Sequence, residues 1–525
     1  MRADLEWGTV PRLAIAAAER FGDAEAVVDG NLRLGFAGLA EAGEAATRAA
    51  MARGLEPGDR AAIWAPNIHE WIVAALGIQG AGGVLVPLNT RFKGGEAADI
   101  LGRSGARMLF CVNGFLGNDY PGLLRSSGVD LPALEHIVVL RGEVVEGTES
   151  WAEYLERGAS VSGQAAARRK ASLRSADLSD ILFTSGTTGR PKGAMSTHAQ
   201  TLRVFETWAD VVGLRQGDRY LIVNPFFHTF GYKAGWVACL LKGATIVPQA
   251  VFDISEAMRR IGEERITVLP GPPTLFQSIL DAPDRHAFDL ASLRLAVTGA
   301  AVVPVEMIRR MRSELTFSTV VTAYGLTEST GTVTMCRPDD DAETIATTSG
   351  RAIPDTETRV VDDAGTEMRA GEPGEVVTRG YHVMQGYFDD PAATAEAIDS
   401  DGWLHTGDIG VMDDNGYLRI TDRKKDLYIV GGFNAYPAEI EGILLRHPGV
   451  SQVAVIGTPD ERLGEVGMAF VVPRPGASVE PDEVIAWARR EMANYKVPRR
   501  VEVVDALPLN ASGKVLKTDL RARPR

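Results

Sequence analysis

Short apolar runs of strand length recur along most of the chain and are separated by stretches with helical periodicity. The runs lie at 61–65, 84–88, 137–140, 220–223, 265–269 and 295–298. Strands that alternate with helices are typical of mainly parallel sheets with crossover helices. Since nucleotides bind at the carboxyl ends of such strands, motifs at strand-to-loop junctions are the first candidates for a functional site.

The segment 71–88 contains 18 residues without a charge, which is long enough for a membrane-spanning helix. Four glycines, Gln79 and Pro87 interrupt it, so we expect instead a buried helix that passes through a glycine turn into a buried strand. The residue order of 236–248, WVACLLKGATIVP, repeats that of this segment. Either coincidence or two related α/β lobes explains the repeat.

The last part of the chain has a different pattern, which indicates a domain boundary. Residues 413–416 form a turn signal between the stretches 409–411 and 417–420, and the polar run 421–426 follows. Beyond it we expect strands at 453–457, 468–472 and 500–504, and a helix at 481–492 that starts with proline. The sequence therefore predicts an N-terminal domain over residues 1–422 and a small α+β domain over residues 423–525.

Composition and charge exclude several classes of protein. With 45% hydrophobic and 24% charged residues among 525, the chain is expected to be globular. Its formal net charge of -14 repels nucleic acid and anionic membrane surfaces, so neither is expected as a partner. The three cysteines are far apart, which argues against a disulfide framework or a zinc site. No signal peptide is expected at the N-terminus, and a cytoplasmic location follows.

The strongest local signal is the segment 184–193, TSGTTGRPKG, which directly follows the strand-length segment 180–183. Its glycines and hydroxyl groups can direct backbone N–H and side-chain O–H groups at phosphate oxygens, and Lys192 adds a mobile cation. The segment is not a Walker A loop, because the spacing GxxxxGK is not satisfied. Standing alone, it could also be a flexible linker.

Three further motifs favour a nucleotide site over a linker. In 324–328, YGLTE, Glu328 offers the hard oxygen ligand that magnesium bound to ATP requires. In 403–408, WLHTGD, the carboxylate of Asp408 lies beside a glycine turn and can accept both ribose hydroxyls. In 507–514, LPLNASGK, a tight turn carries Lys514. Alone, Asp408 would be a surface-turn residue and Lys514 a solvated tail residue.

These motifs together resemble those of acyl-CoA synthetases in the acyl-adenylate-forming superfamily, which also includes luciferases and the adenylation domains of peptide synthetases. Further matches are 371–391, GEPGEVVTRGYHVMQGYFDDP, and 421–439, TDRKKDLYIVGGFNAYPAE. The resemblance covers nearly the whole chain. It implies an α/β fold, in which a large N-terminal domain of two related α/β lobes plus a small barrel-like region precedes a mobile α+β C-terminal domain.

Carried over position by position, the resemblance implies a site for ATP, Mg2+ and coenzyme A. The residues implied for the phosphates are Thr184, Ser185, Gly186, Thr187, Thr188, Gly189, Lys192 and Thr327. Those implied for adenosine are Gly299, Ala300, Ala301, Tyr324, Gly325, Asp408, Ile420 and Arg423. Glu328 and Thr188 would hold the metal, and Lys514 would bridge the carboxylate and the α-phosphate. Lys425 matches the family's hinge, and Gly431, Gly432 and Phe433 its coenzyme A channel. Catalytic roles are implied for Lys514, Glu328, Thr184 and His228.

Specificity for the acid is expected in the segments 224–235, NPFFHTFGYKAG, and 269–274, LPGPPT. The expected pocket residues are Phe227, His228, Phe230, Lys233, Gly271, Pro272, Thr298, Gly299 and Tyr324. His228 could equally be a histidine satisfied inside an aromatic core. The aromatic side chains suit a ring system or a branched chain, and Lys233 could meet a ketone oxygen. Together with 297–301 and 428–437, these segments are similar to those of actinobacterial ligases for a bicyclic methyl-indanedione propanoate, the acid left after steroid rings A and B are degraded.

Four other functions compete with this one. A medium- or long-chain fatty acyl-CoA synthetase uses the same chemistry. A peptide-synthetase adenylation module is disfavoured because no carrier domain or phosphopantetheine serine is expected after Arg525. A luciferase-like oxygenase has only the shared motifs in its favour. A non-catalytic acyl-nucleotide sensor is disfavoured by the joint presence of Glu328, Asp408, Arg423 and Lys514. A homodimer is also possible.

Overall fold

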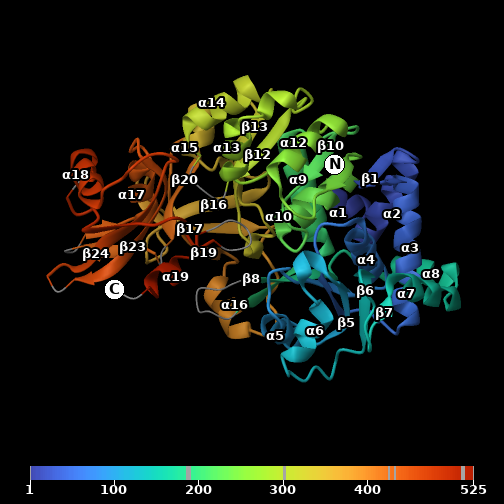
Figure 1. Cartoon of the computed structure of the whole chain (residues 1–525). Helices are drawn as coiled ribbons and strands as arrows, with labels where there is room; N and C mark the ends of the chain where they lie inside the picture. Colours follow the sequence, from blue (N-terminus) through green and yellow to red (C-terminus); the bar gives the residue numbers. More distant parts are fainter. Residues whose placement is uncertain are drawn as a thin grey trace.

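The computed structural model describes residues 2–184, 191–299, 303–423, 426–430, 433–460, 462–492, 494–509 and 515–523. Figure 1 shows a large assembly of sheets and helices with the C-terminal elements, in red, at one side of it. The described residues contain no helix long and apolar enough to cross a membrane.

An eight-stranded sheet forms the first lobe. Its order is β18-β9-β8-β4-β3-β5-β6-β7, and the strands from β8 to β7 pair in parallel. The strand bounds are β3 Arg60–Trp64, β4 Val84–Pro87, β5 Ala106–Val112, β6 His136–Arg141, β7 Glu149–Ser150, β8 Leu178–Thr184, β9 Lys192–Thr197 and β18 Gly386–Tyr387. The buried helix expected before β4 is confirmed as α4, His69–Gly80. It packs closely on α3, Phe36–Ala52, because Gly77 leaves room for Ala46, to which an added Cβ would lie only 2.5 Å away.

A second lobe contains two smaller strand groups. The first has the order β10-β11-β1-β2 and the second β12-β13-β14-β15. The strand bounds are β1 Glu25–Asp29, β2 Leu32–Gly35, β10 Arg219–Ile222, β11 Thr245–Pro248, β12 Leu295–Gly299, β13 Thr319–Tyr324, β14 Thr334–Met335 and β15 Arg351–Ala352. The strand expected at 265–269 is reduced to isolated bridges from Val268 to Tyr220 and Leu295. Arg265 has a φ of +49° and Pro270 lacks an N–H group, so the ladder ends on both sides.

Helices cover the two lobes (Figure 1). Their bounds are α1 Ala3–Glu6, α2 Val10–Phe21, α5 Gly94–Ser104, α6 Tyr120–Ser126, α7 Trp151–Arg157, α8 Gly163–Ser172, α9 His198–Val212, α10 Thr229–Gly231, α11 Ala238–Lys242, α12 Ile254–Glu263, α13 Pro273–Asp281, α14 Val305–Glu314, α15 Ala342–Thr347 and α16 Pro391–Ala397. A π-helix at Tyr232–Val237 joins α10 to α11. One hydrophobic core runs through both lobes and contains the aromatic side chains of Trp71, Tyr232 and Trp236, whose rings contact one another at tilted or edge-on angles.

An antiparallel sheet follows the two lobes, where the small barrel-like region is expected. Its order is β16-β17-β19-β20, with bounds Thr356–Val361, Pro373–Gly380, Leu404–Met412 and Leu418–Arg423. The predicted hairpin between β19 and β20 is confirmed, and the carboxylate of Asp413 accepts the backbone N–H groups of Asn415 and Tyr417 in its turn.

The C-terminal part has its own sheet and core. The elements are β21 Tyr428–Val430, β22 Phe433–Ala435, α17 Pro437–Leu444, β23 Val450–Asp460, β24 Gly464–Pro473, α18 Pro481–Glu491, β25 Arg500–Val503 and α19 Lys517–Arg521. The predicted strands and helix of this region are confirmed. Its apolar residues form clusters separate from the core of the lobes. The boundary between residues 422 and 423 stays a prediction.

Candidate active site

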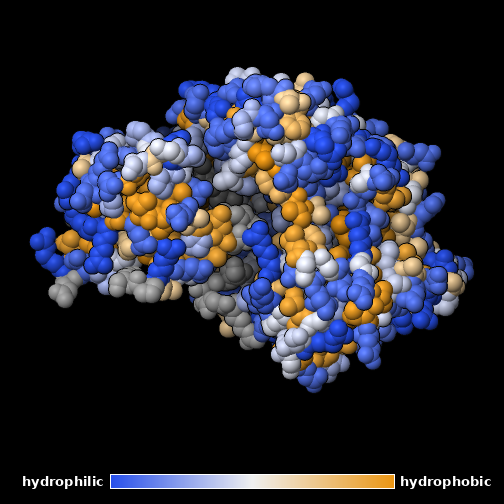
Figure 2. Space-filling view, viewed as in Figure 1, coloured by the Kyte–Doolittle hydropathy of each residue, from blue (hydrophilic) through white to orange (hydrophobic). Residues whose placement is uncertain are grey.

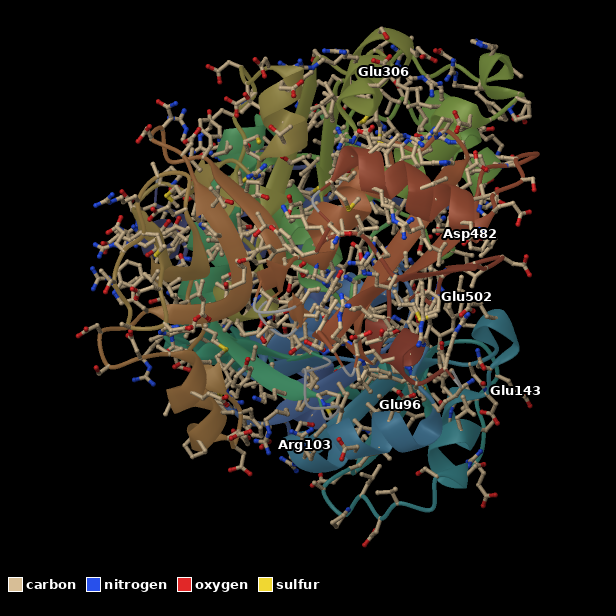
Figure 3. All side chains as sticks on the ribbon, turned by 90° about the vertical axis from the view of Figure 1, so that its left-hand side faces the viewer. Glu96, Arg103, Glu143, Glu306, Asp482 and Glu502 are labelled. Carbon is tan, nitrogen blue, oxygen red and sulfur yellow. The ribbon has the colours of Figure 1, made fainter. Side chains whose placement is uncertain are left out.

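The predicted phosphate-binding motif connects the antiparallel strands β8 and β9, which together form a hairpin. Thr184, the last residue of β8, pairs with Lys192, the first residue of β9. The intervening Ser185, Gly186, Thr187, Thr188 and Gly189 lie outside the described residues. Both ends of the hairpin contact Arg103 of α5, whose Nη1 donates to the carbonyl of Pro191 at 2.7 Å and whose guanidinium lies 5.3 Å from the ring centroid of Phe183. Figure 3 shows Arg103 on the helices below the C-terminal elements.

Glu328 is brought to this hairpin from a distant part of the chain. It lies in a short 3-10 turn, Thr327–Ser329, directly after β13. Its Oε1 is 3.4 Å from the hydroxyl of Thr184 and accepts a 2.9 Å hydrogen bond from the hydroxyl of Tyr387. The ammonium of Lys192 lies 5.0 Å from the centroid of the Tyr387 ring. A hydroxyl, a carboxylate and a cation therefore converge, as a site for a triphosphate requires.

The same group of oxygen atoms fits a magnesium ion. Mg2+ prefers hard oxygen ligands and is commonly bound through one or two carboxylates together with substrate phosphates. Glu328 supplies the carboxylate and Thr184 a neighbouring hydroxyl. Burial and the nearby charge of Glu328 raise the pKa of Tyr387 well above its usual value, so this phenol remains a neutral donor to the carboxylate.

A second group matches the predicted ribose contacts. The hydroxyl of Tyr324, at the end of β13, donates to Oδ2 of Asp408 at 2.6 Å, and Asp408 is only 3% exposed. Asp408 pairs across the β19–β20 ladder with Arg423, of which only the backbone is described. Tyr324 and Ile420 pack against the same small apolar cluster. The three predicted residues Tyr324, Asp408 and Ile420 therefore surround one region.

The end of β12 approaches this group from the second lobe. Gly299 pairs with Ala323 and has a φ of +154°, and a Cβ there would lie 2.8 Å from the carbonyl of Ala323. Gly325 is equally constrained, since its Cβ would lie 2.3 Å from the carbonyl of Gly331. Only glycine permits these close backbone approaches. Ala300 and Ala301 lie outside the described residues.

The predicted acid-binding segments lie side by side. Asn224 donates to the carbonyl of Pro270 at 3.2 Å, and the N–H of Gly271 donates to the carbonyl of Val297 in β12 at 3.0 Å. Asn67 holds the first segment in place, because its amide donates to the carbonyl of Asn224 and accepts the N–H of Phe226. The segments that follow β10 and precede α13 are thereby fixed next to the end of β12.

His228 is exposed, and its Nδ1 accepts the backbone N–H of Phe230 at 3.2 Å. It is therefore not a histidine buried inside an aromatic core. Phe227 and Phe230 are half-buried, and the Phe230 ring makes an edge contact with Trp208. Pro272 is half-buried at the start of α13. The hydroxyl of Thr298 is buried and has no hydrogen-bond partner within the described residues.

Lys233 has a different environment from the one expected. Its Nζ lies 2.9 Å from Oδ1 of Asp180, and both side chains are fully buried, with 1% and 0% exposure. We expected this ammonium to contact a ketone oxygen of the substrate, but in the structure it forms an ion pair with Asp180. The sequence pattern missed this pair because Asp180 lies in an otherwise apolar strand segment.

The predicted C-terminal site residues are described only in part. Lys425, Gly431, Gly432 and Lys514 lie outside the described residues, and only the backbone of Phe433 is described. Leu509 and Val515, the described residues on either side of the segment that contains Lys514, pair in an antiparallel bridge. The helix α19 that follows is held by a 2.8 Å ion pair between Lys517 and the half-buried Glu441, and by another between Arg521 and Asp426.

Comparison with known protein families identifies this arrangement. Residues 15–388 match the AMP-binding enzyme family, and residues 439–514 match the AMP-binding enzyme C-terminal domain. The chain belongs to the AMP-binding enzyme family. The prediction of an AMP-forming acyl-CoA synthetase of the adenylate-forming superfamily is therefore confirmed.

Two curated relatives of this AMP-binding enzyme are full-length matches. They are the 3-(7a-methyl-1,5-dioxo-octahydro-1H-inden-4-yl)propanoyl:CoA ligases of Rhodococcus jostii, 51% identical, and Mycobacterium tuberculosis, 53% identical. Each alignment covers 98% of this chain and 98% of the relative. Among solved structures, the anthranilate CoA ligase AuaEII in complex with anthranoyl-AMP is 26% identical with a TM-score of 0.87, over 99% of this chain and 98% of that one.

The AMP-binding enzyme contains site residues that motif reasoning missed. Tyr387 contacts Glu328 and Lys192, Arg103 contacts both ends of the phosphate hairpin, and Asn67 holds the acid segment. Tyr387 lies in the matched stretch 371–391, so an aromatic residue within a matched motif was the available signal for it. No such signal marks Arg103.

The contact between Tyr324 and Asp408 leads to a test of the ribose site. We expect Tyr324→Phe to raise the KM for ATP by about fivefold to tenfold with little change in kcat, because Asp408 loses a charge-assisted hydrogen bond that orients it. Steady-state kinetics with varied ATP measures this. Tyr417→Phe is a matched control, since it removes a 2.6 Å bond to Asp340. An unchanged KM in Tyr324→Phe would contradict the assignment.

Proposed function

We propose that this enzyme joins 3-(7a-methyl-1,5-dioxo-octahydro-1H-inden-4-yl)propanoate to coenzyme A, using ATP and releasing AMP and pyrophosphate. The observation that carries the proposal is the identity of 51% and 53%, over nearly the whole of both chains, with two ligases named for that acyl group. The acid carries the two rings left when steroid rings A and B are degraded, so a role in steroid and cholesterol catabolism follows.

The acid segments support a ring-shaped substrate. Phe227 and Phe230 supply half-buried aromatic surface, and Asn67 and Asn224 fix the backbone around them. Rigid apolar walls suit a bulky bicyclic group, provided that a few polar groups orient it. With Lys233 held by Asp180, the better candidate to donate to a ketone oxygen is the buried hydroxyl of Thr298, which has no partner among the described residues.

The first half-reaction requires two negatively charged groups to approach. Two unit negative charges about 4 Å apart, one on the carboxylate and one on a phosphate, repel each other by roughly 4 kcal/mol at an effective dielectric constant of about 20. In the proposed mechanism, Lys192 and the hairpin after Thr184 hold the β- and γ-phosphates, while Tyr324, Asp408 and Arg423 hold the adenosine. A magnesium ion bound at Glu328 would supply positive charge to the phosphates.

Lys514 is proposed to contact both the attacking carboxylate and the α-phosphate. Its charge would offset the repulsion mainly in the transition state, where it accelerates the reaction. The second half-reaction needs the thiol of coenzyme A in place of this lysine. We propose that the C-terminal part turns about Lys425, which withdraws Lys514 and brings Gly431 and Gly432 toward the pantetheine channel. His228, an exposed residue of the acid segment, would lie between the acid and the thiol.

The choice of acid can be tested directly. With ATP, Mg2+ and coenzyme A, the purified enzyme should form thioester with the indanedione propanoate far faster than with octanoate. Thr298→Val removes the buried hydroxyl at nearly constant volume, and we expect it to raise the KM for the indanedione about tenfold and leave that for octanoate unchanged. A preference for octanoate would refute the proposed acid and favour a fatty acyl substrate instead.

The match to AMP-forming acyl-CoA synthetases disfavours the alternative of a non-catalytic acyl-nucleotide sensor. Release of pyrophosphate that depends on an added acid distinguishes the two, because a sensor binds the nucleotide without cleaving it. A cytoplasmic location and a homodimer stay predictions, and gel filtration with light scattering tests the second.

A further inference from the structure

The buried ion pair between Asp180 and Lys233 links the two halves of the active site. Asp180 lies on β8, four residues before Thr184 and the phosphate hairpin. Lys233 is the second residue of the π-helix Tyr232–Val237, which begins within the acid segment that contains His228. Their charged atoms are 2.9 Å apart, and solvent reaches 1% and 0% of the two side chains. Because removing both charges from water costs free energy, such a pair adds little to the stability of the fold.

Two irregularities of the backbone meet at this pair. The pairing of β8 with β9 shifts register between Leu178 and Asp180. The hydroxyl of Ser179 donates to Oδ2 of Asp180 at 2.6 Å, so these two consecutive side chains converge. On the other side, Tyr232–Val237 is a π-helix between two α-helical segments. Bulges and π-helices change the direction in which side chains point, and both occur often next to functional sites.

A buried polar network extends the link to neighbouring elements. The hydroxyl of Ser179 contacts the carbonyl of Ser196 on β9 and the hydroxyl of Thr201 on α9. The amide of Gln79 on α4 donates to the carbonyl of Ser179 at 3.0 Å and to the hydroxyl of Tyr232 at 2.8 Å. Burial lowers the pKa of Lys233, and the negative charge of Asp180 opposes that shift. The strand, both helices and the π-helix are therefore held by directional contacts.

We propose that Asp180 and Lys233 are positioning residues, which fix the acid-binding segment relative to the phosphate hairpin. The inference rests on the proposed function, because the carboxylate must be aligned with the α-phosphate for the adenylate to form. Apolar packing alone permits small sliding movements between a strand and a helix, whereas a buried ion pair has one favourable arrangement. Neither residue needs to touch a substrate.

The test is the double variant Asp180→Asn/Lys233→Met, which removes both charges at nearly constant volume. Since no lone charge stays buried, we expect it to fold with a melting temperature near that of the wild type. Acid-dependent pyrophosphate release should fall about 10- to 100-fold, because reacting groups are misaligned. Thioester formation from supplied acyl-adenylate, which does not use the β- and γ-phosphate contacts, should remain within about threefold of the wild-type rate.

A matched control is Asp210→Asn/Lys242→Met, which removes a partly exposed ion pair of 2.5 Å between α9 and α11. Both half-reactions should be unchanged in this control. If the Asp180/Lys233 double variant matches the wild type in both half-reactions, or loses both equally, the positioning role is wrong. If the wild type itself releases no pyrophosphate with the indanedione propanoate or octanoate, the proposed function fails instead.

Discussion

Replacing Lys514 with alanine is expected to lower the rate of adenylate formation by about 100- to 1000-fold, the usual loss when one charge-stabilising group is removed from a transition state. Thioester formation from a preformed acyl-adenylate should be nearly unaffected, because the proposed mechanism withdraws the lysine during that step. Acid-dependent pyrophosphate release measures the first step, and conversion of synthetic acyl-adenylate with coenzyme A measures the second.

The two measurements on one variant control each other. A variant that fails to fold would lose both steps, whereas a variant that lacks only the cation would lose one. Lys514→Arg keeps the charge with a different shape and should retain more adenylate formation than Lys514→Ala. Equal loss of both half-reactions in a folded Lys514→Ala protein would refute this division between the steps.

Glu328→Gln is expected to reduce kcat for adenylate formation by about 100-fold and to shift half-maximal activity to higher Mg2+ concentration. The variant keeps the size of the side chain and an oxygen that can accept from Tyr387 and Thr184, so the loss isolates the negative charge. A magnesium titration of pyrophosphate release checks both effects.

The control is Glu343→Gln, which removes an exposed carboxylate from the first turn of α15. Its magnesium titration should coincide with that of the wild type. A normal magnesium dependence in Glu328→Gln would show that this carboxylate does not hold the metal, and would leave its contact with Tyr387 as a structural one.

The strongest patterns predicted the fold well. The uncharged segment 71–88 folds as a buried helix and strand, and the turn signal at 413–416 forms a hairpin, because in each case local propensity and burial agree. The strand predicted at 265–269 is present only as isolated bridges at Val268. Its apolar character alone does not reveal that Arg265 has a left-handed backbone or that Pro270 lacks a donor.

Side-chain partners were harder to predict than elements. The structure brings the predicted residues together in pairs, Thr184 with Glu328 and Tyr324 with Asp408, at neighbouring strand ends. The contact of Tyr387 with Glu328 joins residues 59 apart in sequence, and that of Arg103 with Pro191 joins residues 88 apart. A sequence pattern shows which face a residue occupies, but not which distant side chain lies opposite.

Lys233 illustrates the same difficulty for a charge. A lysine beside predicted pocket residues suggested a substrate contact, but its partner lies within the core on a strand whose bulge no pattern revealed. On the face shown in Figure 2, hydrophilic and hydrophobic residues are mixed, whereas the pair of Asp180 and Lys233 is buried in the interior.

The two ion pairs of α19 join this helix to the rest of the C-terminal part, because Lys517 pairs with Glu441 and Arg521 with Asp426. In the proposed mechanism this part turns between the half-reactions, and α19 would turn with it. A covalent cross-link between the lobes and the C-terminal sheet is therefore expected to stop turnover even if it alters no residue that touches ATP, acid or thiol.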